Sequence, residues 1–347
     1  MSMPTTIPLK HLKVLVVYSS YPQELIDRVQ ETFGSALIVD CNNINDSNRE
    51  ETIAYMKEVD GFITAPQVKI DQLSLLQHAP KLRAISTVSV GYDNVTVADL
   101  TARGIAFMHT PTVLTDTVAD TTLALMLASA RRICELDQWV RAGLWKAPVT
   151  PPQFGRDVHH KTVGILGFGR IGKAVAQRCS MGFNMNVLYV SRNHGKSAVS
   201  DTSGYNYKAR CVELPELLAT SDFVVLCLPG SAETRHFIST KELEAMKKSA
   251  IIVNIGRGSV IDEEALIKAL ENNTIAGAGL DVYEKEPLAQ SSRLNTLPNV
   301  VIVPHIGSAT HETRFGMANC ALDNLINALQ NDISQNCVNK LDLQKNK

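Results

Sequence analysis

The chain has 347 residues, more than one small hydrophobic core can serve, and its length predicts two domains. Hydrophobic residues make up 45% of it and charged residues 20%, as in ordinary globular proteins. The formal net charge of −1 gives no excess of positive charge that would attract nucleic acid, so we do not expect nucleic acid as a partner. No apolar stretch has the length of a membrane span, so we do not expect a membrane as a partner either.

The cysteines and the N-terminal residues 1–10 indicate where in the cell the protein is located. The seven cysteines are odd in number, scattered and without CxxC spacing, and residues 1–10 contain no apolar signal core. We therefore expect a reducing, cytoplasmic location. The histidines show no metal-ligand spacing, so no metal site is expected.

The first third of the chain alternates β-prone apolar runs with helix-like segments. Parallel neighbouring strands need crossover connections, so this alternation predicts an α/β domain with a doubly wound parallel sheet. The expected strands are 13–18, 36–40, 61–64, 82–88 and 105–109, and the expected helices are 23–33 and 49–59.

A long helical stretch follows Thr110-Pro111-Thr112, and we expect one helix over 117–143. Asp116 or Thr117 is its candidate N-cap, and Gly143 is its candidate end. Its apolar residues are spread around much of the helix surface, more than is needed for one face that packs on the core of its own domain. This excess predicts burial of the helix against a second subunit. These residues are Leu123, Leu125, Met126, Leu127 and Ile133. The expected assembly is a homodimer.

The clearest motif is a glycine turn between a strand at 162–166 and a helix that begins near Ile171. Gly167 can make the tight turn, Gly169 lets the backbone approach a pyrophosphate, and Gly172 permits close packing of helix on strand. The helix N-terminus then attracts the phosphates. This context predicts a dinucleotide site.

The residues after the next strand, 187–191, indicate which dinucleotide binds. NAD-specific sites place an acidic residue there for the ribose hydroxyls, but this chain has Ser191 and Arg192. A hydroxyl and a guanidinium favour a 2′-phosphate, so we expect NADPH, with NADH as a weaker alternative. Arg192 as a solvated loop residue is the competing interpretation.

Further strands at 223–228, 250–255, 276–282 and 300–303 alternate with helices at 214–219, 241–248 and 262–272. With the two strands around the glycine turn they supply a six-stranded Rossmann domain over 111–303. An amphipathic helix at 312–329 follows, and we expect it to return to the first domain, so that 1–110 and 304–347 form a substrate domain.

Three polar motifs directly follow predicted strands, where ligands bind in open α/β sheets. Arg257, between Gly256 and Gly258, can present its planar fork to a carboxylate, or it is a surface salt-bridge residue. Asp281 ends an apolar run and should emerge near the cofactor. Glu286 follows in the next loop, and spacing alone does not exclude Glu284 for the same duty.

His305 follows the last strand, in the stretch VPHIGSAT. A single histidine there is more often structural than catalytic, but reduction of a keto group needs a proton donor near neutral pH. An arginine, a glutamate and a histidine at neighbouring strand ends would together supply an anchor for the substrate, an orienting carboxylate and an acid.

The motifs GFGRIG, NIGRG, GLDVYEKEP and VPHIGSATHETR, in this order, resemble those of the D-isomer-specific 2-hydroxyacid dehydrogenases. The resemblance covers about residues 11–337. The stretches STVSVGYDNV, MHTPTVLTDTVADTT and DVHHKTVGILGFGRIG are similar to those of the bacterial members that reduce glyoxylate, hydroxypyruvate and 2-keto-D-gluconate. A Rossmann domain inserted into a flavodoxin-like substrate domain is the fold that this resemblance implies.

The resemblance also implies roles for single residues. It implies that Arg257 binds the 2-keto acid, that His305 donates the proton and that Glu286 pairs with His305. Backbone groups of Val90 and Gly91 would hold the substrate carboxylate. Cofactor contacts are implied or expected at Gly167, Gly169, Arg170, Ile171, Gly172, Ser191, Arg192, Ile255, Asp281 and Thr117.

The long helix would be a dimer arm, and Trp145 either reaches toward the site of the partner subunit or packs in the core. The expected reaction is NADPH-preferring reduction of small 2-keto acids to D-2-hydroxy acids. The alternatives are another member of the family, of the phosphoglycerate or D-lactate type, and a non-catalytic NAD(H)-sensing dimer of the corepressor kind.

Overall fold

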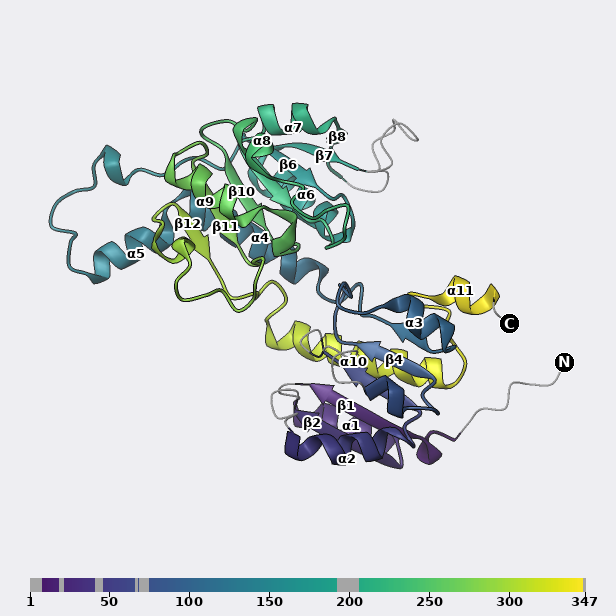
Figure 1. Ribbon diagram of the computed structural model, residues 1–347. Helices are drawn as coiled ribbons and strands as arrows, with labels where there is room; N and C mark the ends of the chain where they lie inside the picture. Colours follow the sequence, from purple (N-terminus) through teal and green to yellow (C-terminus); the bar gives the residue numbers. More distant parts are fainter. Residues whose placement is uncertain are drawn as a thin grey trace. The chain divides into compact units, whose positions relative to one another are not determined.

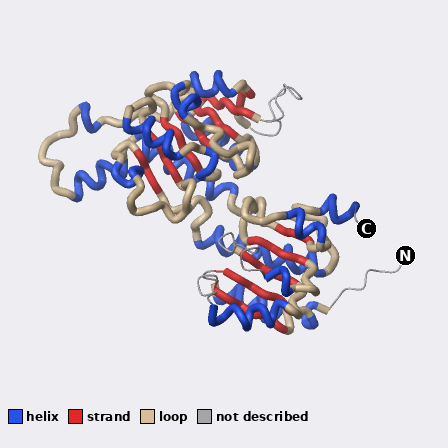
Figure 2. The backbone as a smooth tube through the Cα atoms, in the orientation of Figure 1, coloured by secondary structure: helices blue, strands red, loops and turns tan. Residues whose placement is uncertain are grey.

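The computed structural model describes residues 8–18, 22–40, 46–65, 68, 75–191 and 206–345. The chain divides into two compact units, one made of residues 1–114 and 310–347 and the other of residues 115–309. Each unit is built on its own parallel sheet with helices on its faces (Figures 1 and 2), so the predicted fold class, two doubly wound α/β domains, is confirmed.

The first unit contains a five-stranded parallel sheet in the order β2-β1-β3-β4-β5, which is the flavodoxin-like order. Its strands are β1 (Lys13–Tyr18), β2 (Ser35–Asp40), β3 (Gly61–Thr64), β4 (Ala84–Thr87) and β5 (Ala106–Met108). Its helices are η1 (Leu9–His11), α1 (Gln23–Thr32), α2 (Asp46–Met56), η2 (Leu75–His78), α3 (Val97–Ala102), α10 (His311–Leu329) and α11 (Lys340–Lys345).

Helix α10 returns to this unit after the chain has completed the other one. Leu325 and Leu329 on α10 pack against Gly61 of β3, and Arg83 donates a hydrogen bond to the carbonyl of Leu329. Thr310 caps the helix by accepting a hydrogen bond from the amide of Thr313. Strands β3 and β4 are buried throughout and β1 is buried over residues 14–17, as parallel strands covered on both faces require.

The second unit contains a seven-stranded parallel sheet in the order β12-β11-β10-β9-β6-β7-β8. This order is that of a Rossmann sheet with one more strand at the β12 edge. The strands are β6 (Thr162–Leu166), β7 (Asn186–Val190), β8 (Ala209–Cys211), β9 (Phe223–Leu226), β10 (Ile251–Asn254), β11 (Gly277–Leu280) and β12 (Val300–Ile302). The short strand β8 was not among the six that we expected, because three residues are too few to show the hydrophobic alternation that identifies a strand in the sequence.

Helices cover both faces of this sheet. Leu125 of α4 packs on Gly279 of β11, and α6 lies beside α4 over β6 and β7. On the opposite face, α7 packs on β6 and β7, and leucines of α7, α8 and α9 share one buried cluster with residues of β9 and β10. The helices are α4 (Thr115–Ala130), α5 (Ile133–Arg141), η3 (Pro151–Gln153), α6 (Arg170–Phe183), α7 (Leu214–Thr220), α8 (Thr240–Glu244), η4 (Gly258–Val260), α9 (Glu263–Glu271) and η5 (Arg293–Thr296).

The prediction of one helix over 117–143 is wrong. The segment forms α4 and α5, and it is interrupted at Arg132, whose φ of 56° is left-handed. The Arg132 guanidinium pairs with Glu135 in the first turn of α5 and bonds to the carbonyl of Pro152. Asp116 and Thr117 lie inside α4 rather than at its N-cap, because the helix already begins at Thr115.

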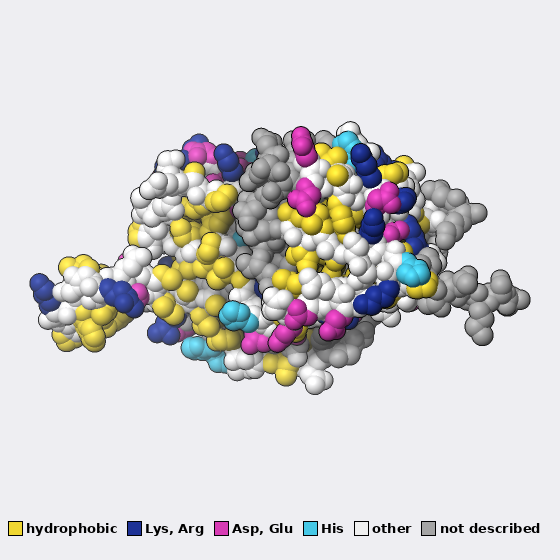
Figure 3. All heavy atoms as spheres, turned by 90° about the horizontal axis from the view of Figure 1, so that it is seen from below, with side chains coloured by type: hydrophobic (Ala, Val, Ile, Leu, Met, Phe, Trp, Pro, Cys, Tyr) yellow, Lys and Arg dark blue, Asp and Glu magenta, His cyan; other side chains and the backbone are white. Residues whose placement is uncertain are grey.

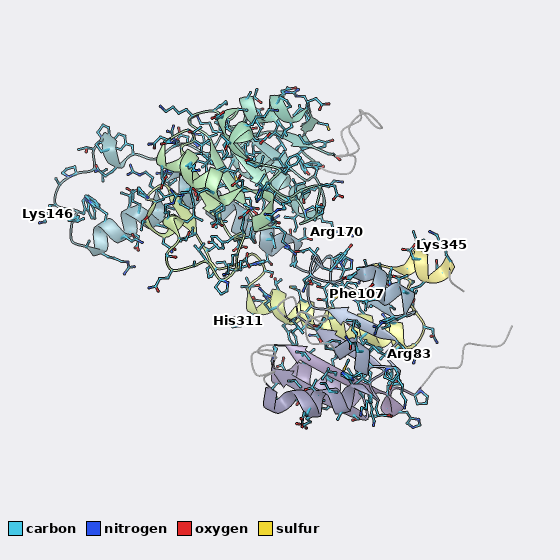
Figure 4. All side chains as sticks on the ribbon, in the orientation of Figure 1. Arg83, Phe107, Lys146, Arg170, His311 and Lys345 are labelled. Carbon is cyan, nitrogen blue, oxygen red and sulfur yellow. The ribbon has the colours of Figure 1, made fainter. Side chains whose placement is uncertain are left out.

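The segment from α5 to about residue 154 projects from its unit, with Lys146 at its tip (Figures 1 and 4). Residues 141–152 are all exposed. Among the described residues, this segment holds most of the exposed large hydrophobic side chains: Ile133, Val140, Leu144, Trp145, Val149 and Phe154. The interpretation of Trp145 as a core residue is wrong, because 60% of it is exposed.

Candidate active site

The predicted site motifs of the second unit lie at the carboxyl ends of parallel strands, along one edge of the sheet. The glycine turn follows β6, Arg257 follows β10, Asp281 and Glu286 follow β11, and His305 follows β12. The parallel register therefore gathers residues that are more than a hundred positions apart in the chain.

The glycine turn has the geometry that a dinucleotide requires. Gly167 has a φ of +97°, and a Cβ there would lie 2.7 Å from the carbonyl oxygen of Cys227. A Cβ on Gly172 would lie 2.2 Å from the oxygen of Gly167, whereas at Gly169 it would meet open space. The chain therefore packs tightly at the first and third glycines and is open at the second, where a pyrophosphate must approach.

Helix α6 begins at Arg170, directly after the turn, and its side chain is exposed (Figure 4). The first N–H groups of the helix and its dipole favour an anion at this end. Gly169 is the N-cap residue, and no side chain caps the helix. These residues fit a bound nicotinamide dinucleotide at this place.

Ser191 follows β7 immediately, at the position where the sequence predicts a contact with the ribose. Arg192, the second residue of that prediction, lies outside the described residues. Phe168 of the glycine turn stacks on Tyr189 of β7, with the ring centroids 3.9 Å apart and an interplanar angle of 13°. This stacking packs the glycine turn against β7, the strand that Ser191 follows.

The loop that carries Arg257 is shaped by a buried amide. The Asn254 side chain accepts a hydrogen bond from the amide of Gly256 at 3.1 Å and donates one to the carbonyl of Arg257 at 2.9 Å. Ile255, which follows Asn254 in this loop, is also buried. Sequence reasoning missed Asn254, although a polar residue at the end of an apolar strand was the available signal.

Gly258 brings the Arg257 loop against the loop that carries Glu286. A Cβ at Gly258 would lie 1.8 Å from the carbonyl carbon of Tyr283, so only glycine fits. The Tyr283 hydroxyl donates to the carbonyl of Val303 at 2.9 Å. Tyr283, also missed from the sequence, therefore connects the ends of β11 and β12.

Glu286 and His305 form a close pair. Glu286 Oε2 lies 2.7 Å from His305 Nδ1, and Glu286 Oε1 accepts a hydrogen bond from the amide of Tyr283 at 3.1 Å. His305 has a φ of 53°, a left-handed backbone that turns the chain sharply after β12. About half of the His305 side chain is exposed, so the ring remains accessible.

The pKa of Glu286 is held below its ordinary value. Burial of the carboxyl raises it, but the hydrogen bond and charge of His305, the amide of Tyr283 and the charge of Arg257 together outweigh burial and lower it. His305 and Arg257 thus each act electrostatically on Glu286, and its carboxylate is ionised near neutral pH.

Glu284, the rival candidate, faces elsewhere. Its carboxylate contacts Nε2 of His236, and its amide donates to Glu263 at 3.2 Å. Burial raises the pKa of Glu263, and the charge of Glu284 adds to the rise although the amide opposes it. The tertiary fold therefore separates two glutamates that the sequence could not distinguish.

Asp281 is buried and supports the backbone beside His305. Its two oxygens accept hydrogen bonds from the amides of Ile306 at 2.6 Å and Gly307 at 2.9 Å. Burial raises its pKa, and the two amides offset part of that rise. The carboxylate therefore holds the 305–307 turn in place after β12.

The remaining predicted residues belong to other parts of the chain. Val90 and Gly91 belong to the first unit, where they follow β4. Thr117 lies in the first turn of α4, and its carbonyl accepts a hydrogen bond from Thr121. Among the described residues, no cluster of metal-ligating side chains occurs and no helix is long and apolar enough to cross a membrane.

A dinucleotide turn, an arginine loop and a histidine–glutamate pair at one sheet edge define the class of a nicotinamide-dependent oxidoreductase. The chain belongs to the D-isomer specific 2-hydroxyacid dehydrogenase family, because residues 123–307 match the NAD binding domain of that family. The predicted family is therefore confirmed, and the protein is an NAD(P)-dependent oxidoreductase.

Comparisons with known proteins support this assignment. The chain is 50% identical, over 325 residues, to glyoxylate/hydroxypyruvate reductase B of Escherichia coli strain SMS-3-5 / SECEC, covering 94% of this chain and 97% of that protein. A crystal structure of a Thermus thermophilus protein matches with a TM-score of 0.83 and 36% identity, covering 94% and 99% of the two chains.

A third match is the crystal structure of an NADPH-dependent glyoxylate/hydroxypyruvate reductase from Sinorhizobium meliloti in complex with NADP and malonate. It has a TM-score of 0.75 and 31% identity, and the match covers 91% of this chain and 93% of that one.

Proposed function

We propose that this protein uses NADPH to reduce small 2-keto acids, namely glyoxylate, hydroxypyruvate and 2-keto-D-gluconate, to D-2-hydroxy acids. The contact of 2.7 Å between Glu286 and His305, beside Arg257, is the observation that carries the proposal. The names of the Escherichia coli and Sinorhizobium meliloti relatives support glyoxylate and hydroxypyruvate as substrates.

Each of the three side chains has a task that its chemistry suits. Nδ1 of His305 faces the Glu286 carboxylate, which leaves Nε2 to donate a proton to the keto oxygen of the substrate. The ionised Glu286 accepts a hydrogen bond from Nδ1 of His305 and so fixes the orientation of the ring. The planar guanidinium of Arg257 binds the carboxylate of the substrate. A bound reduced nicotinamide supplies the hydride to C2.

We propose that the two units bind different ligands. The unit of residues 115–309 would bind the cofactor, and backbone groups of the loop around Val90 and Gly91, in the other unit, would bind the substrate carboxylate. The match of residues 123–307 to an NAD binding domain supports the first half of this proposal. We place the reaction in the cytoplasm, the location indicated by the cysteine usage.

The preference for NADPH rests on the end of β7. Ser191 stands where NAD-specific sites carry an acidic residue, and Arg192 follows it in the sequence. A carboxylate there would repel a 2′-phosphate, whereas a hydroxyl and a guanidinium accept it. An NADP complex of the Sinorhizobium meliloti relative supports this choice.

A panel of keto acids tests the function. The purified protein is mixed with NADPH or NADH and with glyoxylate, hydroxypyruvate, 2-keto-D-gluconate or 3-phosphohydroxypyruvate, and the near-ultraviolet absorbance of the reduced cofactor is followed. We expect turnover with the first three acids and a higher kcat/KM with NADPH. Turnover of the phosphorylated acid alone, or an NADH preference, would contradict the proposal.

We also propose that the protein works as a homodimer whose projecting segment, residues 133–154, packs on the second copy. Six large hydrophobic side chains are exposed along it, and Figure 3 shows hydrophobic side chains gathered on this projection. Such a concentration of apolar surface is costly in water unless a partner covers it. Trp145 is then the candidate to reach the site of the second copy.

Light scattering coupled to gel filtration measures the assembly. The wild type should elute as a dimer, and Ile133→Asp should shift it toward the monomer because a charge would be buried at the interface. Leu341→Asp is the matched control, because Leu341 is 71% exposed and lies outside the segment. A monomeric wild type would overturn the proposal.

A further inference from the structure

The loop that follows β4 in the first unit has two carbonyl groups turned toward polar side chains. The carbonyl oxygen of Val90 lies 3.1 Å from Nδ1 of His109, and that of Gly91 accepts a hydrogen bond from Ser89 Oγ at 2.7 Å. A carbonyl oxygen only accepts, so Nδ1 of His109 must carry the proton in this contact.

The orientation of these carbonyls determines where the neighbouring N–H groups point. Both peptide bonds are trans, so the N–H of Gly91 points away from His109 and the N–H of Tyr92 points away from Ser89. Within the described residues, no hydrogen bond occupies either N–H. Two successive outward N–H groups are a site for an anion such as a carboxylate.

His109 is itself held in place from several sides. Its amide donates to the carbonyl of Asn336 at 3.0 Å, and its carbonyl accepts from the Asn324 side chain at 2.8 Å. Asn324, buried on α10, also accepts a hydrogen bond from Asn336. The ring meets Tyr92 edge to face, with the centroids 5.6 Å apart. A ring fixed in this way can impose one orientation on the Val90 carbonyl.

Ser89 is fixed independently of His109. Its hydroxyl gives its single proton to Gly91, so Thr87 Oγ1, 3.0 Å away, donates to Ser89. The carbonyl of Ser89 accepts from the amide of Thr110. Two separate anchors, one on each side of Gly91, therefore hold the same loop.

We propose that His109 is a positioning residue for substrate binding: its Nδ1–H holds the Val90 carbonyl so that the N–H groups of Gly91 and Tyr92 face the carboxylate of the 2-keto acid. This inference rests on the proposed function, which assigns that carboxylate to this loop. Ser89 likewise holds the carbonyl of Gly91, and so orients the N–H of Tyr92 in the same peptide group. His109 touches neither the substrate nor the cofactor in this scheme.

Two substitutions of His109 separate the donor from the ring. His109→Phe keeps an aromatic ring against Tyr92 but removes the Nδ1–H, whereas His109→Asn retains an amide donor near the Nδ1 position. Loss of one neutral hydrogen bond predicts that His109→Phe raises KM for the keto acid about fivefold. kcat and the Kd of NADPH should change by less than roughly twofold, because a binding contact alone is removed.

Oxalate gives a readout without turnover, because this dicarboxylate offers no keto group for reduction. Titration calorimetry of the NADPH-saturated protein should give a Kd for oxalate that is about fivefold weaker for His109→Phe and close to that of the wild type for His109→Asn. A structural role of His109 would instead lower Tm and kcat in both variants without rescue by asparagine.

Ser89→Ala keeps the test decisive if His109→Phe folds poorly. It removes the donor to Gly91 without disturbing the aromatic contacts, and it should weaken oxalate about fivefold as well. Wild-type oxalate affinity in both His109→Phe and Ser89→Ala would overturn the inference while leaving the proposed function intact. A wild type that reduces no 2-keto acid would overturn the proposed function, and this inference with it.

Discussion

Glu284 and Glu286 lie two residues apart, yet their carboxylates contact different imidazole rings. Glu286 Oε2 lies 2.7 Å from Nδ1 of His305, whereas Glu284 contacts Nε2 of His236. Only the first ring follows β12, at the sheet edge where the glycine turn and Arg257 lie. The two glutamates therefore form a matched pair for mutation.

Glu286→Gln should lower kcat by roughly 10²-fold, since a neutral amide no longer offers Nδ1 of His305 a charged acceptor that orients the ring, and general acid catalysis typically contributes ~10²–10⁴ in rate. Glu284→Gln should leave kcat within about threefold of the wild type, because Glu284 contacts His236 and not the proposed proton donor His305. Steady-state kinetics with hydroxypyruvate and NADPH measures both. Equal losses in the two variants would contradict the assignment of Glu286.

His305→Gln should lower kcat by ~10²–10⁴, the usual contribution of a general acid. The affinity for NADPH, followed by quenching of protein fluorescence, should change little, because the glycine turn and α6 are distant from this side chain in the sheet order. A variant with full turnover would show that another group donates the proton.

The depressed pKa of Glu286 predicts how its contribution to stability depends on pH. A carboxyl whose folded pKa lies below the ordinary value of 4.5 stabilises the fold above that value, and the contribution is lost as pH falls through the folded pKa. The difference in Tm between the wild type and Glu286→Gln should thus be present near neutral pH and shrink in acid.

The expected difference in Tm is small, because a third of the Glu286 side chain is exposed and water screens the pair. Thermal unfolding at a series of pH values measures it. A difference that grows as the pH is lowered would show that the Glu286 carboxyl is not stabilised by its partners in the folded protein.

Ser191→Asp should reverse the cofactor preference. A carboxylate at the end of β7 accepts hydrogen bonds from the ribose hydroxyls of NADH and repels the 2′-phosphate of NADPH. Two charges about 4 Å apart interact by about 4 kcal/mol near a protein surface, so the ratio of kcat/KM values for NADPH and NADH should fall at least about tenfold. An unchanged ratio would remove Ser191 from the cofactor site.

Gly258→Ala should lower Tm and kcat together. The new Cβ would lie 1.8 Å from the carbonyl carbon of Tyr283, so the Arg257 loop and the Glu286 loop must separate. Overpacking of this kind costs about 1–3 kcal/mol. Gly182→Ala is the control, because a Cβ at Gly182 in α6 meets nothing within 4 Å and alanine favours a helix. Wild-type behaviour of Gly258→Ala would show that the loops do not meet there.

Sequence periodicity predicted the elements that local chemistry controls. Strands β1, β3 and β6 lie at the predicted residues, because apolar β-prone runs bounded by polar turns carry their own signal. The prediction of one helix over 117–143 was wrong, and the break at Arg132 involves a contact between residues far apart in the sequence. The Arg132 guanidinium bonds to Pro152, twenty residues further on, and no periodicity within the helix reports that contact.

By itself, the amino-acid sequence determined the alternation of strands and helices, the glycine turn, the family and the identity of Arg257, Glu286 and His305 as candidates. These features are local, since each depends on residues within one strand, one turn or one motif. Only the tertiary structure decided that Glu286 rather than Glu284 reaches His305, that Asn254 and Tyr283 shape the adjoining loops, and that His109 faces the carbonyl of Val90. Each of those contacts joins segments brought together by the sheet or by a folded loop, and packing in three dimensions alone selects the partner.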